Sequence, residues 1–320
     1  MLLSCGDALI DFLPATTADG RAAMMPMVGG ACLNIAVGMA RLGAPTGFVG
    51  GISTDLFGRM IADHAAASGV DLRFATRSAR QTTLAFVSTL NGQPRYAFYD
   101  EQTVSRAWTY QLRAIPFAEI DAIHIGSTTI VDAAGAEQAM ALVGEARGAT
   151  TISFDPNCRP NLVKDKGRYA AAMDSFASCA DIVKMSDIDF DFLYGGDNYD
   201  RIAGELLSTG ASLVVVTRGD QGVLAWHKRV GCVEVEAQRV AVVDTIGAGD
   251  SFQAALLFAL RTIRRIKVRE LAEITSGELN GVLSFASACA AITCGRAAAD
   301  PPHRIEVGSQ LAELAGKTGF

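Results

Sequence analysis

The sequence has few of the residues that build metal centres or disulfide frameworks. Among 320 residues there are seven cysteines, no two of them spaced C-x-x-C, and four histidines that lie far apart. These counts argue against a zinc site, and the odd number of thiols argues against a disulfide framework. Free thiols without a signal peptide predict a cytoplasmic protein.

Long apolar runs and an excess of positive charge are also missing. The longest apolar stretch, near 281–294, is too short and too rich in serine and cysteine to span a membrane. The formal net charge is −6, so general affinity for nucleic acid is not expected. The first apolar run is followed by Gly6-Asp7-Ala8 and not by G-x-G-x-x-G, which argues against a nicotinamide dehydrogenase.

Short Val/Ile-rich runs alternate regularly with amphipathic segments. The runs are of the type that is buried on both faces of a sheet. Strand-like runs cover 1–5, 46–52, 122–125, 151–155, 182–185 and 213–217, and helix-like segments cover 31–42, 56–68, 133–146, 169–178 and 199–208. This rhythm predicts βαβ units around a parallel sheet.

Two segments, 11–28 and 83–100, break the rhythm because they lack helical periodicity and look β-like. The second contains Asn91-Gly92, a strong signal for a hairpin turn. We therefore expect a small β-rich excursion from the α/β body.

The most informative stretch runs from Val242 to Phe252. A β-prone run feeds the turn Gly247-Ala248-Gly249, which opens into an apolar helix. Unpaired N–H groups and the helix dipole make such a helix start an anion site. Asp250 at its rim is explained if it takes a proton from an attacking hydroxyl, as in a phosphotransferase.

Glycines or polar residues also follow the other predicted strands. Since carboxyl ends of parallel strands face one crevice, these groups predict a polar ligand cleft. They are Asp7 and Asp11, Gly29-Gly30 with Asn34, Asp155 to Arg159, Lys184 to Asp191, and Thr217 to Gly222.

Together these motifs resemble the ribokinase-like, phosphofructokinase-B type carbohydrate kinases over nearly the full length. The two signatures are Gly29-Gly30-Ala31-x-x-Asn34 continuing to Arg41-Leu42-Gly43, and Asp244-Thr245-x-Gly247-Ala248-Gly249-Asp250. Details at 6–11, 96–101, 155–159 and 300–302 resemble bacterial fructokinases within that family. The resemblance implies a three-layer α/β/α fold with a mainly parallel central sheet and a small β lid. Residues 1–11, 29–82 and 101–320 would form the core, and 12–28 and 83–100 the lid.

The resemblance also implies roles for particular residues. Asp250 would be the general base, and Gly247, Ala248 and Gly249 the anion hole. Sugar contacts would come from Asp11, Gly29, Gly30, Asn34, Tyr96, Phe98 and Arg159, and nucleotide contacts from Lys184, Ser186, Thr217, Gly219, Gly222 and Ser287. Backbone carbonyls of Asp244 and Ile246 would hold a monovalent cation, usually potassium, and Asp189 would reach Mg²⁺ through water.

The expected activity is ATP-dependent phosphorylation of a primary sugar hydroxyl, most simply O6 of fructose, by a homodimer that pairs through its lids. Open alternatives are a 2-keto-3-deoxygluconate or nucleoside kinase of the same family, and a non-catalytic sugar-binding protein on the same fold. An acidic substrate calls for two or more cations, and the candidates are Arg95, Arg106 and Arg159.

Two positions differ from the family pattern. Ser186-x-x-Asp189 stands where the family often has Asn-x-x-Glu. Arg296 is followed by three alanines where the family often has a glycine. If that glycine has a positive φ, alanine costs about 1 kcal/mol there.

Overall fold

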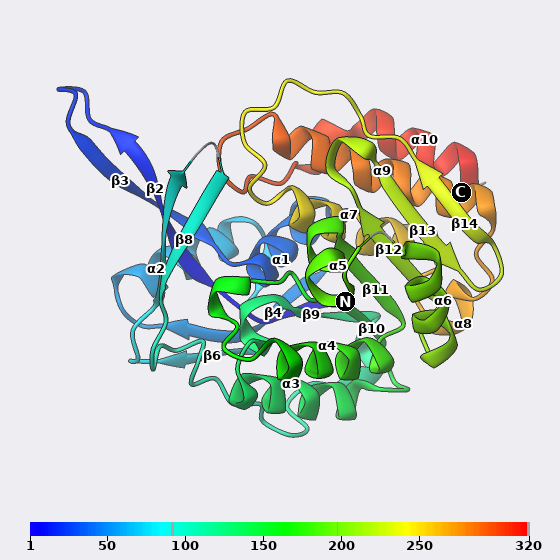
Figure 1. The fold of residues 1–320 in the computed structure, drawn as a ribbon, viewed down its shortest axis with the longest axis horizontal. Coiled ribbons are helices and arrows are strands. Elements are labelled where there is room, and N and C mark those ends of the chain that lie inside the picture. The colour runs from blue at the N-terminus through cyan, green and yellow to red at the C-terminus, as the bar shows by residue number, and fades with distance from the viewer. Residues whose placement is uncertain (91–92, 197, 319–320) are drawn as a thin grey trace.

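The computed structural model describes residues 1–90, 93–196 and 198–318. Within them, a ten-stranded sheet runs in the order β14-β13-β12-β11-β10-β9-β1-β4-β5, and β6 also pairs with β4 (Figure 1). Its strands are β1 (Leu2–Cys5), β4 (Thr46–Ser53), β5 (Val70–Asp71), β6 (Ala75–Ser78), β9 (Ala122–Gly126), β10 (Thr151–Asp155), β11 (Ile182–Ser186), β12 (Leu213–Thr217), β13 (Val223–His227) and β14 (Gly231–Val235).

The strands from β12 to β5 are parallel, and β13 and β14 add an antiparallel edge. In register, Leu2 lies opposite Ala122, which lies opposite Thr151, so neighbouring strands start together. Their carboxyl ends consequently meet at one edge of the sheet.

Helices cover both faces of this sheet. They are α1 (Ala31–Arg41), α2 (Leu56–Ala67), α3 (Ala133–Ala146), α4 (Lys166–Cys179), α5 (Asp187–Tyr194), α6 (Tyr199–Thr209), α7 (Ala248–Thr262), α8 (Val268–Leu271), α9 (Ser276–Cys294) and α10 (Gly308–Thr318). Along β12, Val214 and Val216 join the apolar cluster with α3 and α4, whereas Leu213 and Val215 join the cluster with α7 and α9. The alternation buries every residue of a strand, which explains the continuous Val/Ile runs and confirms the three-layer α/β/α fold.

A second sheet, in the order β3-β2-β7-β8, leaves the body directly after β1 (Figure 1). Its strands are β2 (Leu9–Thr16), β3 (Ala22–Gly29), β7 (Thr83–Leu90) and β8 (Gln93–Tyr99), two antiparallel pairs joined by the parallel β2–β7 pairing. The stacked rings of Phe12 and Phe86, 4.6 Å apart, pack the two pairs together. The β character of both segments is confirmed, while the Asn91-Gly92 turn lies outside the described residues.

The β-prone run before the glycine turn is not a strand, so this expectation was wrong. Residues 236–247 have no regular structure, and Val242 and Val243 are 62% and 64% exposed. The N–H groups of Val243 and Asp244 both donate to the carbonyl of Cys294 at the end of α9. The Cys294 carbonyl is available because a helix leaves its last C=O groups unpaired. Its two hydrogen bonds hold the run 242–244 against the end of α9.

No helix in the described part of the chain is long and apolar enough to cross a membrane.

Candidate active site

A cavity of about 210 Å³ opens where the carboxyl ends of the central strands meet the second sheet. It brings together most of the residues expected to bind sugar and phosphate. Its walls are Asp7, Leu9, Asp11, Gly30, Ala31, Asn34, Tyr96, Phe98, Thr128, Asn157, Arg159, Thr245, Ile246, Gly247, Gly249 and Asp250. Tyr96 and Phe98 come from β8, so the second sheet forms one wall.

One wall is the amino end of α7. Gly247 precedes the helix with a left-handed φ of 77°, a conformation that favours glycine. Ala248 donates its N–H to the carbonyl of Thr245 over 3.3 Å, but within the described residues no backbone acceptor is found for Gly247 or Gly249. With the dipole of a 15-residue helix behind them, these N–H groups are suited to bind an anion, and this helix start is called the anion site below.

Asp250 stands at this anion site with its carboxylate held from across the cavity. Asn34 Nδ2 donates to Asp250 Oδ2 over 2.9 Å. Burial raises the pKa of Asp250 to about 6, although the Asn34 hydrogen bond and the charges of Lys184 and Arg159 oppose the rise. The carboxylate is therefore mostly ionised at neutral pH and still basic enough to accept a proton.

Asp11 faces the same cavity. Burial raises its pKa to about 7, the neighbouring Asp7 adds to the rise, and Arg159 opposes it. The carboxyl group occupies the space that a side chain at Gly29 would need, which explains why that position is glycine. Asp11 and Arg159 are thus suited to hydrogen bonds with the hydroxyls of a small polar ligand.

Lys184 lies behind the anion site. It is 4% exposed, and its Nζ donates to Asp155 Oδ2 over 2.7 Å. Burial would lower the pKa of Lys184, but the Asp155 carboxylate together with Asp189 and Asp250 outweighs burial and raises it. A Cβ added to Gly249 would lie 3.3 Å from Nζ, so a permanent positive charge stands beside the free N–H groups.

Comparisons with known proteins agree with this geometry. The family described as "pfkB family carbohydrate kinase" matches residues 1–305. The chain belongs to the pfkB family of carbohydrate kinases. It is a sugar phosphotransferase, so a non-catalytic sugar-binding protein is not the reading that its relatives support.

Individual relatives within the family are sugar or nucleoside kinases. A fructokinase from Rhizobium leguminosarum bv. trifolii is 38% identical over 274 residues, which are 86% of this chain and 84% of the relative. A crystal structure of a fructokinase with bound ATP from Xylella fastidiosa has a TM-score of 0.86 at 27% identity and covers 100% of this chain and 99% of its own. An aminoimidazole riboside kinase from Salmonella enterica, solved with aminoimidazole riboside and an ATP analogue, has a TM-score of 0.82 at 25% identity and covers 97% of this kinase and 99% of its own chain.

The residues expected to bind nucleotide lie on neighbouring strand ends, outside the walls of the 210 Å³ cavity. Ser186 ends β11 and Thr217 ends β12, and the turn that follows carries Gly219 and Gly222 at φ values of 55° and 83°. Ser287 lies on α9 with a buried hydroxyl that has no hydrogen-bond partner within the described residues.

The side chains of Asp189, expected to reach Mg²⁺ through water, and of Asp244, expected to bind a monovalent cation through its backbone carbonyl, are both occupied by hydrogen bonds. Asp189 forms a capping box with Ser186 at the start of α5 and also accepts from Cys158 N–H over 2.7 Å. Asp244 accepts from Ile246 N–H and Ala298 N–H, each over 3.0 Å. The described residues of the kinase contain no group of three His, Cys, Asp or Glu side chains that could hold a metal ion.

Asp7 has a larger part in the site than its position after β1 indicated. It is 2% exposed and accepts hydrogen bonds from Ser127 Oγ at 2.9 Å, Thr128 Oγ1 at 3.0 Å and Cys32 N–H at 3.0 Å. These bonds tie the ends of β1 and β9 to the start of α1. Asp7 therefore organises the cavity wall, and its signal in the sequence is an acid directly after a buried strand.

Thr128 also lines the cavity and was not predicted, whereas Asn157 lies in the segment 155–159 that was expected to face the cleft. Asn157 has a positive φ of 38°, and Arg159 Nη1 donates to its side-chain oxygen over 2.6 Å. Nothing in the local sequence distinguishes Thr128 from its neighbours, so only the folded chain identifies it.

A larger cavity, of about 430 Å³, lies at the opposite, amino ends of the strands. Its lining includes Arg147, Ala180 and Gly210, the residues at which α3, α4 and α6 end. None of the residues expected to bind sugar, phosphate or nucleotide lines this larger cavity.

Proposed function

We propose that this kinase transfers the γ-phosphoryl group of ATP to the primary hydroxyl O6 of fructose. The observation that carries the proposal is the position of Asp250, whose carboxylate stands beside the unpaired N–H groups of the α7 turn and faces a cavity lined by Asp11 and Arg159. A hydroxyl held between these groups meets a base and a phosphoryl site at once.

In the proposed reaction, Asp250 accepts the proton of the attacking hydroxyl while the new O–P bond forms in line with the breaking bond to ADP. The Gly247 and Gly249 N–H groups receive the charge that develops on the transferred phosphoryl group. Lys184 adds a fixed positive charge behind them. Asp11, Asn34 and Arg159 orient the sugar, and Tyr96 and Phe98 shield it from water.

Fructose is favoured over an acidic sugar by the charge of the cavity. Arg159 lines the cavity. Arg106, a second candidate cation, donates to Asp100, to Asp132 and to the carbonyl of Thr128 and is therefore already paired. Two carboxylates, Asp11 and Asp250, face the same space and would repel a carboxylate substrate.

ATP entering this site brings Mg²⁺ on its phosphates, and Mg²⁺ retains several waters when it is bound through phosphates. Asp189 would contribute through such a water. A monovalent cation would bind to the backbone carbonyls of Asp244 and Ile246, neither of which accepts a hydrogen bond within the described residues. Such a cation would stiffen the turn before α7.

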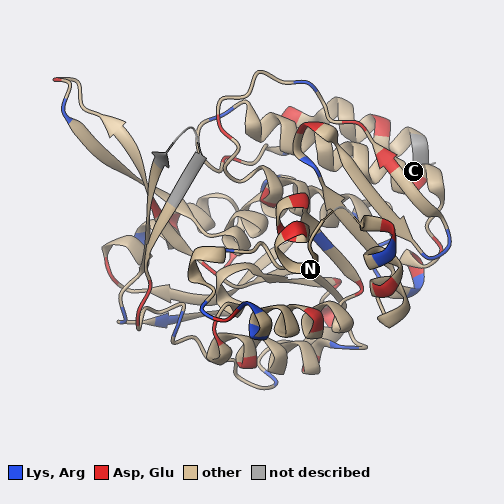
Figure 2. Ribbon diagram, viewed as in Figure 1, with Lys and Arg blue, Asp and Glu red and all other residues tan. Residues whose placement is uncertain are grey.

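The second sheet would act as a lid formed by 12–28 and 83–100, and it also offers a dimer interface. Its edge strand β3 carries no charged side chain (Figure 2) and exposes Met24 and Met25 by 40% and 48%. An uncovered apolar edge is a surface on which a second copy can pack. Sedimentation at micromolar concentration should show a dimer, and a monomer alone would remove this part of the proposal.

A coupled assay of ADP release across a substrate panel tests the proposed function. The panel holds fructose, glucose, 2-keto-3-deoxygluconate, adenosine and aminoimidazole riboside, each with and without potassium. We expect the highest kcat/KM with fructose. Preference for the keto acid or for a nucleoside would replace the proposed substrate, and ADP release independent of any acceptor would contradict transfer to a sugar.

A further inference from the structure

The loop 295–303, which follows α9, lies directly behind the anion-site turn. A Cβ added to Gly247 would come within 2.5 Å of the Ala299 Cβ, so Ala299 fills the space behind the turn. Ala298 N–H donates to Asp244 Oδ2, while Ile246 N–H donates to the other oxygen of the same carboxylate. The loop and the turn therefore share one carboxylate and one close contact.

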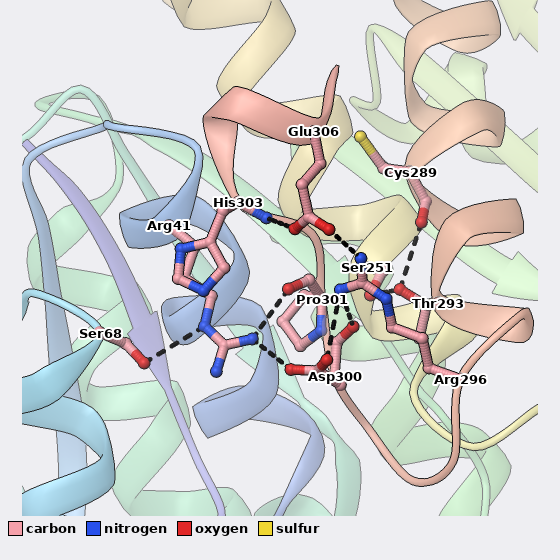
Figure 3. A network of polar contacts seen from close by, with 10 residues as sticks. All are labelled: Arg41, Ser68, Ser251, Cys289, Thr293, Arg296, Asp300, Pro301, His303 and Glu306. Carbon is pink, nitrogen blue, oxygen red and sulfur yellow. Dashed lines mark hydrogen bonds and ion pairs between the residues drawn. The ribbon is translucent and has the colours of Figure 1, made fainter. Parts of the chain in front are cut away.

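The far end of this loop is fixed by ion pairs, which Figure 3 shows around Asp300. Arg41 Nη1 donates to Asp300 Oδ1 over 2.5 Å and to the carbonyl of Pro301 over 2.8 Å. Arg296 Nη1 donates to Asp300 Oδ2 over 3.2 Å, and the same guanidinium also pairs with Glu306. Burial would raise the pKa of Asp300, but the two arginines outweigh it and lower the pKa, so Asp300 is ionised near neutral pH.

Arg41 comes from α1, and another residue of that helix, Asn34, donates the hydrogen bond to the proposed base Asp250. Asn34 and Arg41 are seven residues apart, which places them on the same face about 10 Å from each other along the axis. Between them, Gly38 packs so closely on α7 that a Cβ there would lie 2.7 Å from the Ala254 Cβ and 3.5 Å from the Pro301 Cβ. The helix thus contacts the Asp250 carboxylate at one end and the loop 295–303 at the other.

We propose that Arg41 and Asp300 are positioning residues for phosphoryl transfer: their ion pair joins α1 to the loop 295–303 and so fixes Asp250 and the turn Gly247–Gly249 in one geometry. The inference rests on the phosphotransfer proposed above and is independent of which sugar accepts the group. Neither side chain lines the 210 Å³ cavity. They act through Ala298 and Ala299, so losing the pair changes how the base and the N–H groups are aligned and leaves the sugar contacts in place.

The test compares Asp300→Asn, Arg41→Met and Arg41→Lys with the wild type, using the best substrate of the panel. Asp300→Asn and Arg41→Met should lower kcat about 10-fold, because a misplacement of about 1 Å at reacting groups costs up to roughly 100-fold. The KM for sugar should stay within about 2-fold, since the contacts that bind the sugar equally in the ground state and the transition state are kept. Arg41→Lys keeps the charge and should recover most of kcat.

The matched control is Asp121→Asn, which removes partly exposed ion pairs to Arg261 (2.9 Å) at the other end of α7 and to the amino group of Met1 (3.0 Å). It should leave kcat unchanged even where it lowers the melting temperature. A second readout needs no turnover: ADP with aluminium fluoride and sugar should bind about 10-fold more weakly to Asp300→Asn, whereas ADP alone should bind as to the wild type.

Unchanged kcat in both Asp300→Asn and Arg41→Met would overturn the inference, and so would an equal loss of kcat in Asp121→Asn. If Arg41→Met or Asp300→Asn melts below the assay temperature, the binding of ADP with aluminium fluoride and sugar, measured below the melting temperature, decides: an affinity equal to that of the wild type would overturn the inference. Failure of the proposed function would appear separately, as a wild type that phosphorylates no compound of the panel. In that case the binding of ADP with aluminium fluoride still tests whether the Arg41–Asp300 pair aligns Asp250 with the turn Gly247–Gly249.

Discussion

Asn34 and Asp250, 216 residues apart in the chain, meet through a hydrogen bond of 2.9 Å between Nδ2 and Oδ2. The amide donates to the carboxylate and so favours its ionised form against the burial that raises its pKa. This contact thus joins the Gly29-Gly30 motif to the Gly247–Gly249 turn and limits the rise in the pKa of Asp250 that burial causes.

Replacing Asp250 by Asn should remove the base and keep the shape of the cavity. We expect kcat to fall at least about 100-fold, since a positioned base contributes roughly 10²–10⁴ in rate. Fructose binding by calorimetry should stay close to that of the wild type. The control is Asp63→Asn, an exposed acid on α2. Turnover by Asp250→Asn at the rate of this control would refute the assignment.

The pH dependence of kcat should report the Asp250 carboxyl group. Activity should decrease as the pH falls through about 6, where Asp250 becomes protonated. Asn34→Leu removes a donor that lowers this pKa, so the acid limb of the profile should move to higher pH. Profiles of wild type and Asn34→Leu from pH 5 to 9 check this, and a limb that moves to lower pH would contradict it.

Asp11 should make stability depend on pH. Because its pKa is raised to about 7 in the folded protein, the folded state favours the protonated form. The stability that Asp11 contributes is full below its unfolded pKa of about 4 and is lost as the pH rises through 7. The free energy of unfolding of Asp11→Asn should therefore rise relative to that of the wild type between pH 4 and 8, by on the order of 4 kcal/mol. Urea unfolding of both proteins at pH 4 and at pH 8 measures this difference in the free energy of unfolding. A lead of Asp11→Asn over the wild type that shrinks as the pH rises would contradict the prediction.

Ala298 has a positive φ of 61° in the position where a glycine was expected from the family pattern. Three terms compete in Ala298→Gly. Relief of the left-handed conformation gains about 1–2 kcal/mol, the freer unfolded chain costs about 0.4–1 kcal/mol, and loss of a buried methyl costs about 0.8 kcal/mol.

The three terms nearly cancel, so Ala298→Gly should be close to neutral. Ala297→Gly, at an exposed neighbour without positive φ, should cost about 0.5–1 kcal/mol. Denaturant midpoints of the two variants measure the difference. If Ala298→Gly were the less stable of the two, the φ assigned to Ala298 would be wrong.

Lys184→Met should destabilise the protein by about 3–5 kcal/mol, because it leaves the buried Asp155 carboxylate without its partner. Lys184→Met with Asp155→Leu should recover most of that stability, since both charges are then removed. Activity should not return in the double variant, because the positive charge beside Gly249 is still missing. Thermal melting and kcat/KM for ATP separate the two effects, and recovery of both would show that Lys184 is structural only.

Much of the fold followed from local patterns. The strand at 213–217 and the helix at 133–146 were predictable because a buried strand must be apolar on both faces and an amphipathic helix repeats every 3.6 residues. The run at Val242 and Val243 shows where this fails. Its residues prefer strands, but the N–H groups of Val243 and Asp244 donate to the carbonyl of Cys294 at the end of α9, and no local pattern indicates that partner.

The sequence by itself determined the chemistry of the α7 turn, because glycines, a helix start and an acid in the first turn are local features that create a potential anion site wherever the chain places them. Only the tertiary structure decided what surrounds that turn. The contacts of Asn34 with Asp250, of Lys184 with Gly249 and of Arg41 with Asp300 join residues that are 65 to 259 positions apart in the chain. No local periodicity reaches that far. Such contacts depend on how strands and helices pack, and packing is a property of the whole chain.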